Sequence, residues 1–364
     1  MQTKLWHLKK NSDWTQELTE AAGLLRQGEV VAFPTETVYG LGADGLNATA
    51  CAKIFAAKGR PSDNPLILHI AAKEEILPLS KNLSAHAKRL MAAFWPGPMT
   101  LIVPKSELVP DLVTAGLDTV AVRMPDHPIA KALIQAAGCP IAAPSANKSG
   151  RPSPTTAAAV LEDMEGLIAG VIDGGLANIG VESTIIDTTT AVPVILRPGG
   201  ITREMLEEVL GVVEIDPGLV AKNVTPKAPG MKYRHYAPRA DMYILTGPEA
   251  AVMLERLVTQ ALELGNKVGV LASDATANHL TPQNRLVTYS WDSKAELGQE
   301  LYEYLRRFDA EEVDLIIAQA VTEEDLGLAI MNRMRKAAGQ NILWAENGKL
   351  LPQSGSSPSF YDTI

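Results

Sequence analysis

The chain has 364 residues, which exceeds the usual size of one domain, and its 46% hydrophobic content can form more than one core. Its formal net charge of −9 argues against a protein that mainly coats nucleic acid, although a local basic patch is compatible with it. Cys51 and Cys139 have no metal-ligand spacing and are too few for a disulfide framework, so we expect a reducing, cytoplasmic setting. No apolar run is long enough for a signal peptide or a bilayer crossing, so we expect no membrane partner.

Residues 1–212 alternate between strand-like runs rich in β-branched residues and segments with helical periodicity. This alternation predicts one large α/β domain. Within it we expect helices at 14–27, 48–57, 84–95 and 202–210, and strands at 29–35, 65–71, 100–104, 120–125, 139–145, 170–175, 183–188 and 193–199.

Residues 213–240 have little periodicity, four prolines and more basic than acidic side chains, so they are predicted to form a linker. Residues 241–345 return to the alternation of strands and helices, which predicts a smaller domain with a parallel, doubly wound sheet. Its strands are expected at 242–247, 267–273, 285–291 and 313–321, and its helices at 248–264, 293–308 and 326–338. Residues 346–364 are polar and are predicted to form a C-terminal tail.

The run GLGADG at 40–45 fits the glycine pattern of dinucleotide-binding loops, but a polar run at 35–39 separates it from the preceding strand. We therefore expect these glycines to permit tight turns of the backbone rather than to bind a nicotinamide cofactor. The chain contains no Walker A sequence, so a nucleotide would have to be held by another device.

Two proline-rich segments carry polar groups in a constrained backbone. In KGRPSDNPL, at 58–66, prolines bracket the polar residues 62–64, and two cations precede them. In PSANKSGRPSPT, at 144–155, hydroxyl and amide groups follow a predicted strand, where ligands of α/β proteins bind. Two interpretations stay open at this point: rigid polar turns, or loops that hold phosphate, ribose or a base.

Four polar side chains stand inside or beside apolar strand patterns: His69, Arg123, Ser183 and Arg197. A single histidine in such a strand is more often a satisfied core residue than a ligand-binding one. An arginine cannot discard its charge when it is buried, so Arg123 and Arg197 each need an anion from the protein or from a ligand.

The six scattered histidines and two cysteines give no metal cluster, no catalytic triad and no activated thiol that can be assembled from the sequence. Covalent catalysis and a protein-bound metal are therefore not expected. The remaining cations, hydroxyls and amides suit a phosphate-bearing substrate and the charge that develops during group transfer.

The motifs PTETVYGLG, KGRPSDNPL, WPGPMTLIV, VAVRMPDHP, PSANKSGRPSPT, GVESTIID and ILRPG stand in this order between residues 34 and 199. Together they resemble the threonylcarbamoyl-AMP synthases, in the long Sua5 form. KYRHYAP in the linker resembles the segment that joins the two domains of this family. The resemblance implies a YrdC-like twisted mixed sheet with helices, linked to a smaller Rossmann-like α/β domain.

The resemblance implies an enzyme that condenses L-threonine, bicarbonate or CO2, and ATP into threonylcarbamoyl-AMP and pyrophosphate. Mg²⁺ is then expected with ATP as substrate. The product would pass to a tRNA-modifying threonylcarbamoyl transferase, which acts on the adenosine next to the anticodon. Weak direct binding of tRNA is left open.

The resemblance also implies roles for particular residues. Lys58 and Arg60 would be catalytic, and 213–240 would act as a lid over the site. ATP would be bound by Arg60, Asn64, Thr119, Ser145, Asn147, Ser153, Arg197, His235 and Tyr236, and threonine by Thr35, His69, Arg123 and Ser183.

An alternative from another class is an RNA-binding module without ATP turnover. The net acidic charge of residues 1–212 argues against it, but charge summed along a sequence says nothing of a concave basic face. A carbamoyl-transferring maturation factor, whose relatives carry zinc fingers, is disfavoured because the chain has no CxxC pairs.

Overall fold

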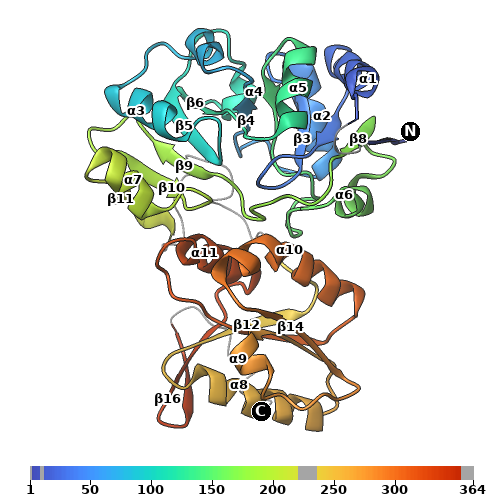
Figure 1. The fold of residues 1–364 in the computed structure, drawn as a ribbon, viewed down its shortest axis with the longest axis vertical. Coiled ribbons are helices and arrows are strands. Elements are labelled where there is room, and N and C mark those ends of the chain that lie inside the picture. Colours follow the sequence, from blue (N-terminus) through green and yellow to red (C-terminus); the bar gives the residue numbers. More distant parts are fainter. Residues whose placement is uncertain (1, 9–11, 220–235, 354–364) are drawn as a thin grey trace. The chain divides into compact units, whose positions relative to one another are not determined.

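A computed structural model describes residues 2–8, 12–219 and 236–353 (Figure 1). The chain divides into two compact units. The first holds Met1–Ser149 and Ser153–Tyr233, and the second holds Gly150–Pro152 and Arg234–Ile364. None of the helices in the described part of the chain combines the length and the apolar character that a bilayer crossing requires. The predicted linker at 213–240 lies largely outside the described residues.

The first unit is built on a mixed sheet of eleven strands in the order β1-β8-β2-β3-β7-β4-β6-β5-β9-β10-β11. Parallel and antiparallel pairs alternate irregularly along it: β4 is parallel to β6, for example, whereas β5 is antiparallel to β6. The mixed-sheet prediction is thereby confirmed. The strands are β1 (Lys4–His7), β2 (Val31–Phe33), β3 (Gly40–Asp44), β4 (Ile67–His69), β5 (Met99–Pro104), β6 (Thr119–Arg123), β7 (Ile141–Ala142), β8 (Gly170–Asp173), β9 (Thr184–Asp187), β10 (Val194–Arg197) and β11 (Glu214–Ile215).

Helices cover the two faces of this sheet unequally. Alternate residues of β2 point to opposite faces, so Ala32 and Phe33 enter different apolar clusters. The Phe33 cluster is covered by α1 (Thr15–Arg26) and α5 (Pro128–Ala137), which pack against each other. The Ala32 cluster is covered by α2 (Ala48–Lys58), η1 (Lys73–Leu79), α3 (Ala85–Phe94), α4 (Asp111–Thr114), α6 (Ala157–Met164) and α7 (Arg203–Leu210).

In the glycine-rich run at 40–45, Gly40–Asp44 form strand β3, which corrects the tight turn expected at Gly40 and Gly42, whereas Gly45 lies in the turn that follows β3. A Cβ atom at Gly42 would lie 2.8 Å from side-chain carbons of Phe33 and of Ile141. At Gly45, a Cβ would lie 2.5 Å from Leu68. These glycines therefore permit close packing of strands and rings, and none of them has a positive φ.

The second unit has a six-stranded sheet in the order β14-β13-β15-β12-β16-β17, parallel except for β17. The predicted doubly wound parallel sheet is confirmed. Its strands are β12 (Asp241–Thr246), β13 (Val268–Ser273), β14 (Leu286–Trp291), β15 (Leu315–Gln319), β16 (Ile342–Glu346) and β17 (Lys349–Pro352). Its helices are α8 (Ala250–Glu263), α9 (Asp274–Ala277), α10 (Lys294–Ala310) and α11 (Gly327–Ala337). In the first unit, the described residues end with a short 3-10 turn, η2 (Pro217–Leu219).

Strand β17 lies inside the range that we predicted to be a tail. Glu346 pairs with Lys349, so Asn347 and Gly348 form a two-residue hairpin turn, and both have positive φ. An Asn-Gly pair is the strongest short-range signal for such a turn. The sheet therefore continues past residue 345, and the described chain ends shortly after β17.

Candidate active site

Arg123 stands at the centre of a row of polar side chains on one face of the first unit's sheet. It is the last residue of β6, and it pairs in register with His69 on β4 and with Thr100 on β5. Residues opposite each other on neighbouring strands point to the same face and lie about 5 Å apart. The sheet thus brings two of the predicted threonine-binding residues together.

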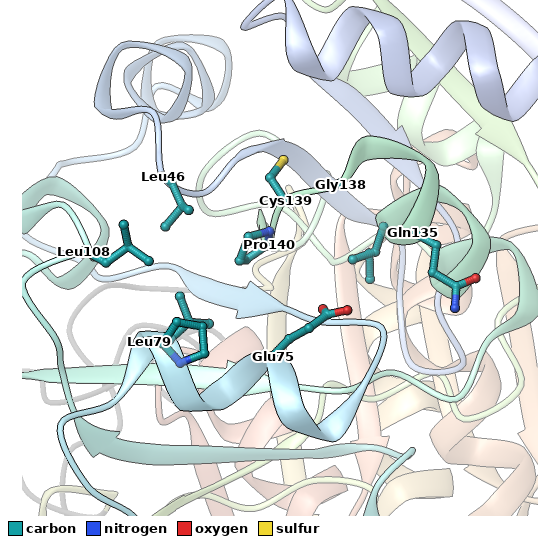
Figure 2. Close-up of a pocket in the computed structure, with 10 residues that line it drawn as sticks. Leu46, Glu75, Leu79, Leu108, Gln135, Gly138, Cys139 and Pro140 are labelled. Carbon is teal, nitrogen blue, oxygen red and sulfur yellow. The ribbon is translucent and has the colours of Figure 1, made fainter.

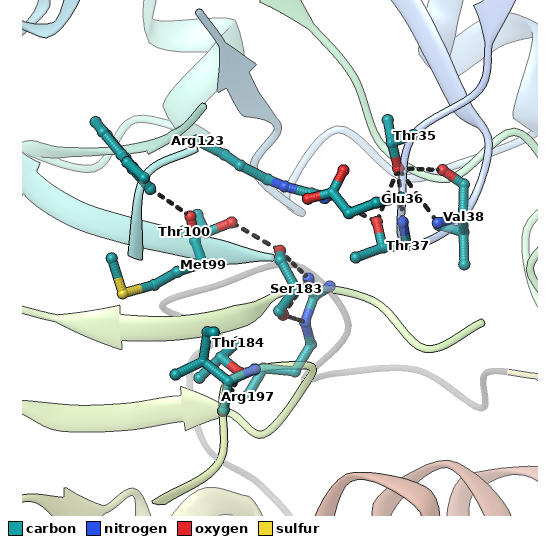
Figure 3. A network of polar contacts seen from close by, with 12 residues as sticks. Thr35, Glu36, Thr37, Val38, Met99, Thr100, Arg123, Ser183, Thr184 and Arg197 are labelled. Carbon is teal, nitrogen blue, oxygen red and sulfur yellow. Dashed lines mark hydrogen bonds and ion pairs between the residues drawn. The ribbon is translucent and has the colours of Figure 1, made fainter. Parts of the chain in front are cut away.

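The loop after β2 packs its hydroxyl groups against Arg123 (Figure 3). The Thr35 hydroxyl donates to the Val38 carbonyl at 2.6 Å, so the 2.8 Å contact between Thr35 Oγ1 and Thr37 Oγ1 is donated by Thr37. Thr37 Oγ1 in turn accepts a hydrogen bond from Arg123 Nη1 at 2.9 Å. A continuous chain of hydrogen bonds therefore links Thr35, another predicted threonine-binding residue, to Arg123.

Ser183 and Arg197 extend the same row on its other side (Figure 3). Ser183 Oγ lies 2.7 Å from Thr100 Oγ1. The Arg197 guanidinium donates from Nε and Nη2 to the Ser183 carbonyl, at 3.1 and 2.9 Å, and from Nη2 to Ser183 Oγ at 3.1 Å. Arg197, which we predicted to bind ATP, is thus placed directly beside the predicted threonine group.

His69 is buried and electrically neutral in this setting. Burial, and secondly the charge of Arg123, lower the pKa of His69 to about 3. Its Nδ1 lies 3.1 Å from the Ile67 carbonyl, and its ring meets the edge of Phe33. His69 can therefore form hydrogen bonds and van der Waals contacts with a ligand, but it carries no positive charge near pH 7.

Lys58, the last residue of α2, holds the serine-rich loop from inside. Its side chain is buried, and Nζ donates to the carbonyls of Ser145 and Asn147, at 2.5 Å each. The Ser149 amide donates to the Lys58 carbonyl, and Ser145 Oγ donates to Asn147 Oδ1 at 2.6 Å. Three of the predicted site residues thus form one cluster, which places a positive charge under the loop.

The loop at 58–66 is closed by its own arginine. The helix ends at Gly59, which adopts a left-handed conformation with φ of 60°. Arg60 Nη2 then donates to the carbonyls of Asn64 and Pro65, at 3.3 and 3.1 Å. Asn64 is fully buried, so the loop has the fixed shape that its prolines predict.

The other predicted site residues make different contacts. Thr119 begins β6 and so lies at the opposite end of that strand from Arg123. Ser153 is buried and donates to Glu182 Oε1 at 2.7 Å. Tyr236 belongs to the second unit, where its ring centroid lies 5.1 Å from that of Tyr302. His235 lies outside the described residues.

Sequence reasoning did not single out Glu36, whose carboxylate is buried beside Arg123. Glu36 Oε1 lies 2.6 Å from Arg123 Nη2, and both side chains are about 95% buried. The signal was present, since Glu36 is a charged residue between two apolar strands in a quoted motif. Thr100 was missed as well, because a threonine inside a strand is unremarkable by itself.

A cavity of about 250 Å³ lies elsewhere in the first unit (Figure 2). Glu75 projects toward it, and one of its oxygens accepts a hydrogen bond from the Ala71 amide at 3.0 Å. None of the predicted site residues lines this cavity, whose walls are Leu46, Glu75, Pro78, Leu79, Leu108, Ile134, Gln135, Gly138, Cys139 and Pro140.

The fold and the site define an α/β protein in which buried cations and hydroxyls lie together in one unit. A family model for Sua5, YciO and YrdC proteins, described as "Telomere recombination", matches residues 23–199. A second model, described as threonylcarbamoyl-AMP synthase, C-terminal domain, matches residues 201–339.

Relatives match the chain over nearly its full length. The threonylcarbamoyl-AMP synthase of Pyrococcus abyssi is 52% identical over 327 residues, which are 89% of this chain and 94% of the relative. That of Bacillus subtilis is 48% identical over 357 residues, 94% of this chain and 100% of the relative. The crystal structure of P. abyssi Sua5 complexed with L-threonine matches with a TM-score of 0.90 and 48% identity, covering 94% of this chain and 100% of that one. This chain therefore belongs to the threonylcarbamoyl-AMP synthase family, in its two-domain Sua5 form.

Proposed function

We propose that this protein is an L-threonylcarbamoyladenylate synthase, which condenses L-threonine, bicarbonate or CO2, and the Mg²⁺ complex of ATP. The observation that carries the proposal is that the first unit contains two clusters of hydrogen-bonded polar side chains. Lys58 holds the loop of Ser145 and Asn147, and Arg123 stands in a buried row of hydroxyls. The names and the coverage of the relatives support the same activity.

The chemistry needs no nucleophile from the protein. The ammonium of threonine first loses a proton to water, and the neutral amine then adds to CO2. Loss of a second proton to water gives the carbamate, and a carbamate oxygen attacks the α-phosphorus of ATP. The bond from that phosphorus to the bridging oxygen breaks, and pyrophosphate leaves with the electron pair. The protein has to position the reactants and neutralise charge, which fixed cations and hydroxyls do well because they need not reorganise in the transition state.

The roles that we propose divide the residues into two groups. Lys58 and Arg60 face the phosphates. The nucleotide group is completed by Asn64, Thr119, Ser145, Asn147, Ser153, Arg197, His235 and Tyr236, and the threonine group consists of Thr35, His69, Arg123 and Ser183. Arg123 would bind the carboxylate of threonine, because a guanidinium can hold a carboxylate by two hydrogen bonds.

We further propose that the product passes to a threonylcarbamoyl transferase that acts on tRNA, and that direct tRNA binding is weak. The two cysteines of the chain are free, which supports a cytoplasmic setting. The alternative of an RNA-binding module without ATP turnover is not favoured by the names of the relatives.

The test is pyrophosphate release from ATP and Mg²⁺, with threonine and bicarbonate supplied singly and then together, and with mass spectrometry of the adenylate. Release that needs both, together with the mass of threonylcarbamoyl-AMP, is the expected result. No release by folded protein under any combination would refute the proposal. Salt-dependent tRNA binding by the same inactive sample would then favour the RNA-binding alternative.

A further inference from the structure

Glu36 holds a buried carboxylate that forms an ion pair with Arg123. Only 5% of the residue is exposed, and Oε1 lies 2.6 Å from Arg123 Nη2. Within residues 2–8, 12–219 and 236–353, Oε2 has no hydrogen-bond partner. Buried carboxylate oxygens almost always accept hydrogen bonds, so this atom points to a donor supplied by a ligand.

Arg123 shows the matching feature of opposite charge. Its Nη1 donates to Thr37, whereas Nε has no hydrogen-bond partner among the described residues. Glu36 and Arg123 thus form a buried, electrically neutral pair in which each partner keeps hydrogen-bonding capacity. A zwitterionic α-amino acid is neutral too, and it carries an ammonium donor and a carboxylate acceptor on adjacent atoms.

Hydrogen bonds within the first unit hold the loop that carries Glu36, which Figure 3 shows beside Arg123. The Ile179 amide donates to the Glu36 carbonyl at 2.8 Å, and the Gly180 amide donates to the Thr37 carbonyl at 3.1 Å. Thr35 holds the other side of the loop through Val38. The carboxylate therefore has little conformational freedom to lose when it binds a ligand.

We propose that Glu36 binds the α-ammonium group of the amino-acid substrate, while the neighbouring Arg123 takes its carboxylate. This inference rests on the proposed function, because it takes L-threonine as the substrate. The ammonium donates to Glu36 Oε2, which fixes the nitrogen that later becomes the carbamate nitrogen. The pair thereby selects free α-amino acids over hydroxy acids of the same shape.

Calorimetric titration with two ligands tests this assignment. L-Threonine is compared with (R)-3-hydroxybutyrate, which keeps the carboxylate and the hydroxyl but lacks the amine. The wild-type protein is expected to bind threonine about 10- to 100-fold more tightly, the range for one charge-assisted hydrogen bond. In Glu36→Gln, threonine binding weakens by a similar factor, while binding of the hydroxy acid changes less than about threefold.

Glu75→Gln is the matched control, because this carboxylate also accepts a backbone hydrogen bond but lies at the separate cavity of Figure 2. It should leave both affinities unchanged. Thermal unfolding checks that each variant is folded.

Folded Glu36→Gln that binds threonine like the wild type, or that loses both ligands equally, would overturn the inference. Equal affinities of the wild-type protein for the two ligands would overturn it without any variant. Wild-type protein that binds threonine selectively but releases no pyrophosphate would refute the synthase and leave the ammonium site standing. Wild-type protein that binds no threonine would refute both.

Discussion

Replacing Lys58 by methionine removes the ammonium that holds the serine-rich loop and keeps most of the side-chain volume. Lys58 Nζ donates to two carbonyls, those of Ser145 and Asn147. A hydrogen bond to a charged group contributes about 1.5–3 kcal/mol, so we expect the free energy of unfolding to fall by about 3 kcal/mol or more. For a unit of this size that is a decrease of roughly 6–12 °C in the unfolding midpoint. Pyrophosphate release should fall at least about 100-fold, because the loop and the charge are lost together.

Lys53→Met on the same helix is the matched control. Lys53 forms an ion pair with Glu29 at 2.8 Å, and its side chain is 43% exposed. Exposed pairs contribute about 0–1 kcal/mol, so this variant should unfold within roughly 3 °C of the wild type and keep its activity. Scanning calorimetry of both variants provides the comparison. If Lys58→Met and Lys53→Met have the same unfolding midpoint, the reasoning that the Lys58 ammonium supports the loop is refuted.

Three further changes test other parts of the first unit. Because the pKa of His69 is about 3 when folded and near 6.5 when unfolded, the unfolded chain binds the extra proton between these values. Stability should thus fall by up to about 1.4 kcal/mol per pH unit below 6.5, and denaturant titrations of His69→Gln should lack this share. Arg197→Lys loses the two-pronged contact that holds the Ser183 carbonyl, so it should raise the KM for threonine, which Ser183 is proposed to bind, about tenfold. Exposed Arg203→Lys should not change this KM, and equal KM values for the two variants would contradict the role of the contact with Ser183. Gly42→Ala should destabilise by about 1–3 kcal/mol. A Cβ at Gly23 in α1 has room, so Gly23→Ala should stabilise the protein by up to about 1 kcal/mol. Denaturant midpoints that shift in the same direction in the Gly42 and Gly23 variants would contradict this pair of predictions.

Helices and strands with a clear hydrophobic period were predictable from the sequence, and those whose sequence pattern was ambiguous were not. The helix expected at 48–57 is α2, and the strand expected at 120–125 overlaps β6. We did not predict helices α5 and α6. Helix α5 begins with a proline and ends before Gly138 in a left-handed cap, so its boundary signals were present. The apolar residues of α5 come only a few positions after the apolar strand β6, and this proximity obscured the helical period of α5.

The candidate site was predictable as a set of residue types, and only partly as a place. The need of Arg123 for an anion follows from its charge, but the sequence does not say that Glu36 supplies one. The family resemblance assigned Arg197 to the nucleotide, and no sequence feature ties it to Ser183. Their contact depends on the register of β9 and β10, which shifts at a bulge next to Arg197.

The α/β class, the two-part organisation and the residue types at the site were predictable from the sequence, since composition, periodicity and motifs are properties of neighbouring residues. Which of those residues touch depends on the three-dimensional packing of the chain. The row from His69 through Arg123 to Thr100 joins three strands that are far apart in the chain, and strand order and register are set by long-range packing. Glu36 Oε2 has no hydrogen-bond partner among the described residues, and this too is a property of that packing, because it can be recognised only from the placed neighbours.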